Sequence, residues 1–345
     1  MSAVGDDLRP AGTDWVKAPE RSNMLALRVI CALALWCGRP LTRLILHPIT
    51  LYFLLFSPTQ RRHVRRYLAR AIGPRAGWRD GYRLLHNFAS IVLDRVYFLR
   101  GRMGLFDVQV QGGEAVEAEV RAGRGAFLVG AHIGSFEALS ACRQQAEAPV
   151  DLRLAMLMYP DNARRINAVL EAISLPEYRP HVIALGRPAA MLELRDWLDG
   201  GRMAGMLGDR TLAIGEDDGA QRGNRVQIDF LGQPAWFNDG PFRLAALLRR
   251  PAVFMAGLYL GGNRYQVVFE PLADFSAPAA ATAPAPGGAD AAAPRRARGL
   301  DPAERERRIR EALETYVRRL EDLCRAHPHN WFNFHDFWLE DSPRG

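Results

Sequence analysis

Hydrophobic and polar positions group into two kinds of segment that alternate along the middle of the chain. Short apolar runs at 126–129, 152–158, 181–185 and 203–207 have the length and the bounding residues of buried strands. Amphipathic segments with a helical period occupy 162–173 and 189–198 between them. Strands that alternate with helices favour parallel pairing, because each helix carries the chain back across the sheet. The pattern therefore predicts an α/β fold with a mixed, largely parallel sheet flanked by helices.

The pattern changes in the last third of the chain. Apolar runs at 252–260 and 265–270 are separated by Gly261, Gly262 and Asn263, which predicts two strands joined by a hairpin turn. Residues 276–299 are rich in Ala, Pro and Gly and have no regular period, which predicts a flexible insertion. Asp301 followed by Pro302 then predicts the start of a long C-terminal helix over 301–326.

The first 80 residues form a distinct region that is both basic and apolar. From Arg21 to Arg79 the chain has eleven arginines and no acidic residue, with apolar runs at 29–37 and 44–56. The longer run would extend about 20 Å as a helix, which is less than the roughly 30 Å hydrocarbon core of a bilayer. We therefore expect 1–80 to be an N-terminal membrane-associated helical segment lying in the interface, and 81–345 to be the α/β domain. One tilted span over 24–46 and a buried helical hairpin are the alternatives.

The basic residues of this region indicate which partners it meets. Five arginines follow the second apolar run, at positions 61, 62, 65, 66 and 70. Arginines next to strongly apolar helices suit the anionic lipid head groups of a cytoplasmic membrane surface. The same charge would attract an acidic carrier protein by electrostatic steering. Nucleic acid is not expected, because the basic residues flank apolar helices rather than isolated stacking aromatics.

Composition removes several classes of mechanism. The chain has 345 residues, a formal net charge of +7 and a single lysine, Lys17. Schiff-base chemistry is not expected, and no phosphate-loop Gly-x-x-x-x-Gly-Lys motif is present. The four cysteines, at 31, 37, 142 and 324, form no Cys-x-x-Cys pair. They favour buried thiols in a reducing compartment over a disulfide framework or a zinc site, so we expect no metal.

The candidate catalytic residue is His132, which follows the apolar run 126–129 and precedes a helix expected over 135–145. The turn between a strand and a helix is a usual place for chemistry in an α/β sheet. Glu137 can meet the imidazole if His132 lies on the turn and Glu137 in the first helical turn. Such a carboxylate fixes the tautomer and leaves the second nitrogen as a general base. A hydrogen-bonded structural histidine is the alternative. Small residues leave space around the ring: Gly130, Ala131, Gly134 and Ser135.

A second candidate group follows the strand expected at 203–207. Asp209 and Arg210 come directly after Gly208, at the same edge of the sheet as His132 if the two strands are parallel. Arg210 could hold a phosphate or an oxygen that gains negative charge during a reaction, with Asp209 orienting it. A structural ion pair that closes a loop is the alternative.

Two aromatic segments complete the candidate site. The segment 228–241 leads into a helix expected over 242–249, with Asn238 or Asp239 as its N-cap and Pro241 in its first turn. Trp236 and Phe237 in this segment would form an apolar wall of the site or part of the core. The tail 327–338 is dense in aromatic residues, and we expect it to seal the core as a plug. We do not expect a catalytic role for the pair His335 and Asp336.

Several of these motifs, in this order, resemble the lysophospholipid acyltransferase superfamily, in particular its bacterial lipid A biosynthesis (lauroyl/myristoyl) acyltransferase-like branch. The residues that carry the resemblance are the His-x-x-x-x-Glu spacing of His132 and Glu137, the Gly-Asp-Arg at 208–210, and the block 228–241. The N-terminal pattern from Trp15 to Arg70, Val-Leu-Asp-Arg at 92–95 and the aromatic tail add to it. The resemblance covers 15–338 apart from the insertion. The Phe-Pro-Glu-Gly-Thr motif with which some relatives bind phosphate is absent from the third block.

The resemblance implies an O-acyltransferase that moves a fatty acyl group from an acyl carrier protein or coenzyme A thioester to a hydroxyl of a membrane (glyco)lipid. It implies His132 as general base and Glu137 as its partner, with no cofactor besides the thioester co-substrate. It also implies a location at the cytoplasmic face of a bacterial inner membrane. A thioester hydrolase and a non-catalytic membrane adaptor are the alternatives. The substrate-binding residues would be Gly134, Ser135, Asp209, Arg210, Trp236, Phe237 and Asn238.

Overall fold

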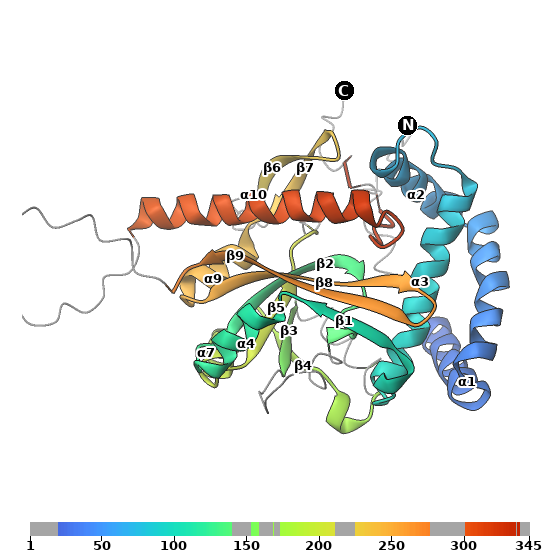
Figure 1. Ribbon diagram of the computed structural model, residues 1–345, viewed down its shortest axis with the longest axis horizontal. Coiled ribbons are helices and arrows are strands. Elements are labelled where there is room, and N and C mark those ends of the chain that lie inside the picture. Colours follow the sequence, from blue (N-terminus) through green and yellow to red (C-terminus); the bar gives the residue numbers. More distant parts are fainter. Residues whose placement is uncertain are drawn as a thin grey trace, which may run out of the picture.

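The computed structural model describes residues 20–139, 153–158, 168, 173–210, 225–276, 301–335 and 337–338. A seven-stranded sheet lies at its centre, with helices on both faces (Figure 1). Every pair of neighbouring strands is parallel except β8 and β9, which form an antiparallel hairpin. The α/β fold class and the largely parallel, mixed sheet are therefore confirmed. In spatial order the strands are β1 (Asp107–Gln111), β9 (Arg264–Asp274), β8 (Pro251–Gly261), β2 (Ala126–Gly134), β5 (Met203–Leu207), β3 (Leu154–Met158) and β4 (His181–Ala184).

Different helices cover the two faces of this sheet. The long helix α10 (Pro302–Ala326) and the short α9 (Gly240–Leu247) lie on one face (Figure 1). Helices α4 (Gly113–Arg121) and α7 (Pro188–Asp199) lie on the other, with short 3₁₀ turns at Met103–Leu105 and Pro176–Tyr178. A separate antiparallel pair, β6 (Arg225–Phe230) and β7 (Gln233–Asn238), extends beside α10. Tyr316 of α10 is fully buried and donates to the carbonyl of Gly130 at 2.9 Å, which fixes α10 on the central strand.

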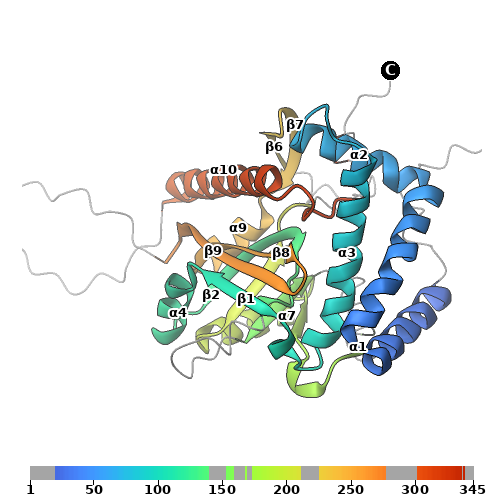
Figure 2. The same cartoon turned by 45° about the vertical axis from the view of Figure 1, so that its right-hand side comes forward.

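The N-terminal helices form a block at one end of the sheet. Helix α3 (Trp78–Phe98) stands between the sheet and α1 (Glu20–Phe56), and α2 (Pro58–Ala71) turns away at the end of α1 (Figure 2). Gly38 interrupts α1 with φ 77° and ψ 167°, a kink that a glycine accommodates without strain. No single helix in the described part of the chain is long and apolar enough to cross a membrane. The pair Cys31–Phe56 and Pro58–Ala71, bent by 94°, satisfies that test by length and composition.

Most element boundaries follow the sequence pattern. Strand β5 has the predicted limits, and the predicted hairpin is formed by β8 and β9. Asp301 caps α10, because its carboxylate accepts a hydrogen bond from the backbone N–H of Ala303 at 3.2 Å. The predicted helix over 162–173, the residues 140–145 of the helix expected after His132, the insertion 277–299 and Asp336 lie outside the described residues, apart from helical positions 168 and 173.

One boundary needs correction at the candidate site. The apolar run 126–129 is only the first half of β2, which continues to Gly134. His132 therefore lies inside the carboxyl end of the strand rather than on a turn after it. Residues 135–138 form the turn instead. The sequence pattern misses this extension because Gly130, Ala131 and Gly134 are small and weakly strand-forming.

Candidate active site

The site is built where two parallel strands end side by side. Gly130 of β2 pairs with Leu207 of β5, and the N–H of Gly208 donates to the carbonyl of Gly130 at 2.9 Å. His132 and Asp209 each lie two residues beyond that last pair. The predicted meeting of the two segments at one edge of the sheet is therefore confirmed, and parallel register is its cause.

The imidazole of His132 is held by the carboxylate of Asp209. Nδ1 of His132 lies 2.8 Å from Oδ1 of Asp209, while the backbone N–H of His132 donates to Oδ2 at 2.9 Å. Because a carboxylate can only accept at this geometry, Nδ1 carries the proton and Nε2 keeps its lone pair. The side chain of His132 is 29% exposed, and Nε2 has no hydrogen-bond partner among the described residues. A neutral imidazole fixed in this way presents a base to whatever occupies the site.

Asp209 stays ionised although it is almost completely buried, with 1% of its surface exposed. Burial on its own would raise the pKa of this carboxyl. The charge and hydrogen bond of His132, the charge of Arg210 and the indole of Trp331 together hold the pKa below its ordinary value. Trp331 supplies the third hydrogen bond, from its Nε1–H to Oδ2 at 2.9 Å. The carboxylate is therefore a permanent acceptor for the imidazole.

The carboxylate of Glu137 does not bind a ring nitrogen of His132, which is the role that the sequence predicted for it. Its carboxylate makes an ion pair with Nε of Arg95 at 2.6 Å and accepts from Oγ of Ser135 at 3.2 Å. The carboxylate that the structure places on Nδ1 is that of Asp209, which corrects the sequence-based assignment of this role to Glu137. The physical reason is the extension of β2, which directs His132 toward β5 before the turn carrying Glu137 begins.

The backbone conformation beside His132 requires a small residue. Gly134 has φ 64°, and a Cβ at this position would lie 1.9 Å from the carbonyl oxygen of Gly257 on β8. The next residue, Ser135, is buried and donates its N–H to the same carbonyl at 2.6 Å. Gly134 therefore lets β2 end tightly against β8, and both residues shape the backbone beside the imidazole.

The C-terminal tail forms the other wall of the site. Ile133 and Trp331 make an antiparallel bridge, and the N–H of Phe332 donates to the carbonyl of His132 at 2.8 Å. Trp331, Phe332 and Phe337 are buried, so the predicted core-sealing plug is confirmed. Arg210 reaches the same tail, where its guanidinium lies 3.5 Å from the carbonyl of Phe332. Arg210 thus lies next to the pair formed by His132 and Asp209.

The residues of the segment 236–238 are used for packing and for the start of a helix. Phe237 is fully buried against Phe230 and Phe337, so it is a core residue, and Trp236 is half-buried on the same strand, β7. Asn238 accepts from the N–H of Gly240 at 2.8 Å and so satisfies the start of α9. Asp239 occupies the N-cap position without a side-chain cap and pairs with Arg243 at 2.9 Å instead.

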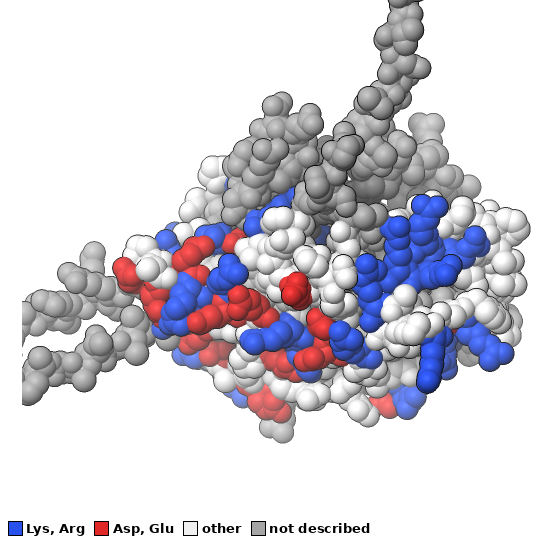
Figure 3. All heavy atoms as spheres, turned by 90° about the horizontal axis from the view of Figure 1, so that it is seen from above, with Lys and Arg blue, Asp and Glu red and all other residues white. Residues whose placement is uncertain are grey.

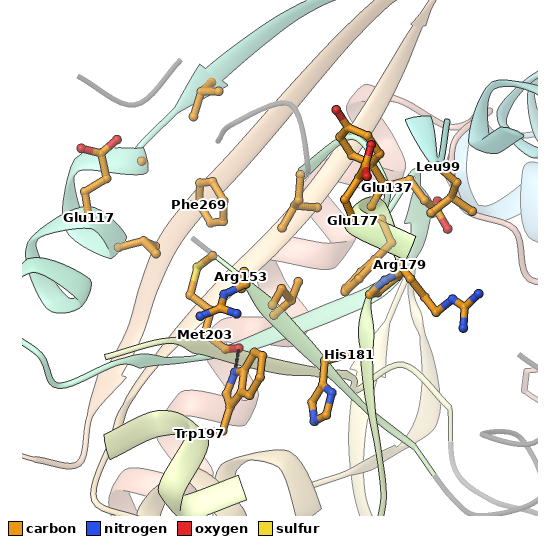
Figure 4. Close-up of a pocket in the computed structure, with 18 of the residues that line it drawn as sticks. Leu99, Glu117, Glu137, Arg153, Glu177, Arg179, His181, Trp197, Met203 and Phe269 are labelled. Carbon is orange, nitrogen blue, oxygen red and sulfur yellow. Dashed lines mark hydrogen bonds between the residues drawn. The ribbon is translucent and has the colours of Figure 1, made fainter. Parts of the chain in front are cut away.

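A cavity of about 790 Å³ opens on the face of the sheet that α4 and α7 cover (Figure 4). Its apolar lining comes from strands and loops that are far apart in sequence, such as Val110, Leu154, Met203 and Phe269. Glu137 and Glu177 lie together on one side of the cavity, whereas Trp197 and His181 lie toward another (Figure 4). The lining is partly apolar and includes charged side chains such as Glu117 and Arg153.

Two contributors to the site had no functional assignment in the sequence. Trp331 looked like one aromatic of a plug, and nothing in its spacing indicated a bond to a residue 122 positions away. Arg95 lies in the Val-Leu-Asp-Arg segment, but its pairing with Glu137 depends on how α3 packs. Among the described residues no group of three or more His, Cys, Asp or Glu is placed to bind a metal ion.

No protein-family model matches the chain, and no curated protein matches it either.

Proposed function

We propose that the protein is a membrane-associated O-acyltransferase, which uses the His132–Asp209 pair to transfer a fatty acyl group from a thioester to a hydroxyl of a lipid acceptor. The observation that supports this most is the geometry of the pair. The buried carboxylate holds Nδ1 at 2.8 Å, and the partly exposed ring offers Nε2 as a base. Acyl transfer to an alcohol needs a base of this kind to take the hydroxyl proton.

The chemistry of such a step balances on these residues. Nε2 of His132 takes the proton of the acceptor hydroxyl while its oxygen attacks the thioester carbonyl. The C–S bond then breaks, and the imidazolium returns the proton to the leaving thiolate. Asp209 remains ionised throughout and stabilises the imidazolium, as a buried carboxylate does beside a catalytic histidine. Arg210 lies at the same edge and would stabilise the oxyanion or a phosphate of the acceptor.

The cavity would hold the acyl chain of the donor. Glu137 lines it together with apolar residues of the sheet such as Leu154, Met203 and Phe269. Each methylene removed from water contributes roughly 0.8 kcal/mol, so such a cavity would favour long-chain donors. Glu137 and Arg95 would then form a polar margin where the chain meets the reacting carbonyl. The donor would be an acyl carrier protein or coenzyme A thioester.

Surface composition supports a membrane location. Large apolar side chains on α1 are exposed to an unusual degree, with Trp36 89%, Leu44 63% and Phe56 69% exposed. Arg61, Arg62 and Arg65 are exposed on the adjoining helix α2. Basic residues gather over the end of the molecule formed by α1–α3, whereas acidic and basic residues are mixed along α10 (Figure 3). An apolar helix face flanked by arginines suits the interface of an anionic bilayer, such as the cytoplasmic face of a bacterial inner membrane.

Thioester consumption in the presence and absence of membrane lipid extract tests the proposal. The comparison uses the intact protein, His132→Ala, and His327→Ala as a matched control at the end of α10. We expect lipid-dependent consumption that the first substitution abolishes and the second leaves unchanged, with the labelled acyl group recovered in a lipid. Consumption without lipid would instead indicate a hydrolase. Membrane binding without any consumption, for several chain lengths and both donor types, would indicate a non-catalytic adaptor.

A further inference from the structure

We propose that Trp331 is a positioning residue of the active site, which holds the Asp209 carboxylate in the orientation that His132 requires. This role rests on the proposed acyl transfer for its kinetic consequence, although the geometry itself does not. Trp331 is fully buried, and its only polar atom, Nε1, points to Oδ2 of Asp209 at 2.9 Å. The indole therefore meets the catalytic pair through one directed hydrogen bond to a charged oxygen, which is stronger than a neutral one.

The two oxygens of Asp209 have different tasks. Oδ1 faces Nδ1 of His132, while Oδ2 receives both the backbone N–H of His132 and the indole N–H of Trp331. Two donors on one oxygen prevent the carboxylate from rotating about its Cβ–Cγ bond. Without the indole, Oδ2 accepts from one donor only, and the negative charge of the carboxylate is less stabilised. It would then stabilise the imidazolium more strongly and fix the ring less sharply.

The segment 330–332 is anchored well enough to perform this task. The side chain of Asn330 accepts from the N–H of Tyr259 at 2.8 Å and donates to its carbonyl at 3.1 Å, which fixes the tail on β8. The N–H of Gly134 donates to the carbonyl of Asn330 at 2.8 Å. The backbone on both sides of Trp331 is thus bound to the strands that carry the site.

Aromatic packing fixes the indole plane in turn. Tyr67 of α2 meets Trp331 edge-on with ring centres 4.9 Å apart, and Phe230 of β6 does so at 5.3 Å. Each such pair adds to the cost of turning the ring away. The indole cannot reorient without disturbing both neighbours, so its N–H is directed at Asp209 by packing against two separate elements, α2 and β6.

The test compares Trp331→Phe with Trp338→Phe. Both substitutions keep a ring and remove one indole N–H from the same aromatic cluster. The N–H of Trp338 donates instead to the backbone carbonyl of Phe230 at 3.3 Å, away from Asp209. Acyl transfer would be measured against pH for both variants and the intact protein. In parallel, ¹⁵N NMR of the imidazole would report its tautomer without substrate, with the signals of His132 identified by their loss in His132→Gln.

We expect Trp331→Phe to lower the transfer rate near neutral pH by roughly 10- to 100-fold, the usual weight of one hydrogen bond to a charged group. The acid limb of its pH–rate profile should move to higher pH. The Asp209 carboxylate, with one donor fewer, is more basic and stabilises the imidazolium form of His132 more strongly. Trp338→Phe should leave the shape of the profile unchanged. Equal rates and superimposable profiles for the two variants would overturn the proposal.

The NMR comparison separates this inference from the proposed function. If the intact protein transfers no acyl group, the proposed function is wrong. A mixture of His132 tautomers in Trp331→Phe, and not in Trp338→Phe, would still support the positioning role of Trp331. An unchanged tautomer overturns it. Should Trp331→Phe fail to fold, the indole N–H of Trp331 can be observed in otherwise intact protein. Asp209→Asn should then move that proton resonance upfield, and no movement would count against the hydrogen bond.

Discussion

Two aspartates, Asp94 and Asp209, are equally buried and equally well bonded, yet they belong to regions with different tasks. Asp94 is 0% exposed, and Arg39 donates to both of its carboxylate oxygens at 2.7 and 2.8 Å. The hydroxyl of Tyr265 donates to Oδ2 of Asp94 at 2.7 Å. Asp209 is 1% exposed and has His132 and Trp331 as its side-chain donors. Burial and hydrogen-bond count therefore do not distinguish a structural carboxylate from a candidate catalytic one.

The distinction lies in what the partner can do next. Arg39 is permanently charged, and its Nη2 also donates to the carbonyl of Gly262 at 2.5 Å. This network ties the N-terminal α1 to α3 and β9. The imidazole of His132 has a second nitrogen, Nε2, which has no hydrogen-bond partner among the described residues. A buried carboxylate can support catalysis when its hydrogen-bond partner has a second proton-accepting atom that a substrate can reach.

The largest expected effect comes from Asp209→Asn. An amide cannot replace the carboxylate as acceptor from Nδ1 and from both other donors, so the imidazole loses its tautomer. We expect transfer to fall by about 10³–10⁴-fold, as for the comparable change in a serine-protease triad. A steady-state assay on folded protein, verified by circular dichroism, measures it. A loss smaller than tenfold would place Asp209 outside the catalytic pair.

Arg39→Ala tests the other side of the comparison. It leaves Asp94 buried without its cation, so we expect the free energy of unfolding to fall by about 3–5 kcal/mol. Urea denaturation measures this, with Arg43→Ala as the matched control. Arg43 donates to the same Gly262 carbonyl at 2.6 Å but has no carboxylate partner among the described contacts, so its loss should matter much less. Equal destabilisation by both variants would contradict a structural role for the ion pair.

The membrane proposal predicts a smaller effect without loss of fold. Phe53 and Phe56 are 50% and 69% exposed on α1, so their replacement by serine should leave stability within about 0.5 kcal/mol. Binding to anionic vesicles should fall at least about tenfold, since each ring buried in the interface contributes roughly 1.5–3 kcal/mol. Vesicle flotation measures it. The matched control is Leu192→Ser with Leu247→Ser, which removes exposed apolar groups from the α/β domain.

The last prediction concerns the dependence of stability on pH. Burial lowers the pKa of His335 to about 4, helped by the charge of Arg210, and burial lowers that of His86 to about 4, helped by His47. Both values lie below the ordinary 6.5, so the unfolded chain binds protons first as the pH falls. Stability should therefore decline from pH 6.5 to about 4 through these two residues. Urea midpoints of His86→Gln and His335→Gln should vary less over that range, and unchanged slopes would contradict this.

Below about pH 4 Asp209 adds to the decline. Its pKa is lowered in the folded protein, so it contributes stability above the ordinary carboxyl value near 4 and loses it as the pH falls toward the folded value. The two histidines and the aspartate thus act in adjoining pH ranges. Asp209→Asn should remove only the lower part of the decline.

Much of the fold was predictable because it depends on local pattern. The strand Met203–Leu207, the hairpin around Gly262 and the Asp301 cap follow from neighbouring residues, and each is confirmed. The expected proximity of His132 and Asp209 also followed, since parallel strands bring their carboxyl ends to one edge. The assignment of Glu137 to the imidazole did not hold. It depended on where β2 ends, and strand boundaries among small residues are poorly specified by sequence.

The sequence alone determined which residues could perform chemistry and which segments would be strand or helix, because side-chain type and periodicity are local properties. Only the tertiary structure decided which carboxylate meets His132, because that depends on the register of β2 against β5 across 77 residues. The same holds for Trp331, whose bond to Asp209 exists because the tail pairs with Ile133. Long-range hydrogen bonds of this kind are fixed by packing, and no short spacing in the chain records them.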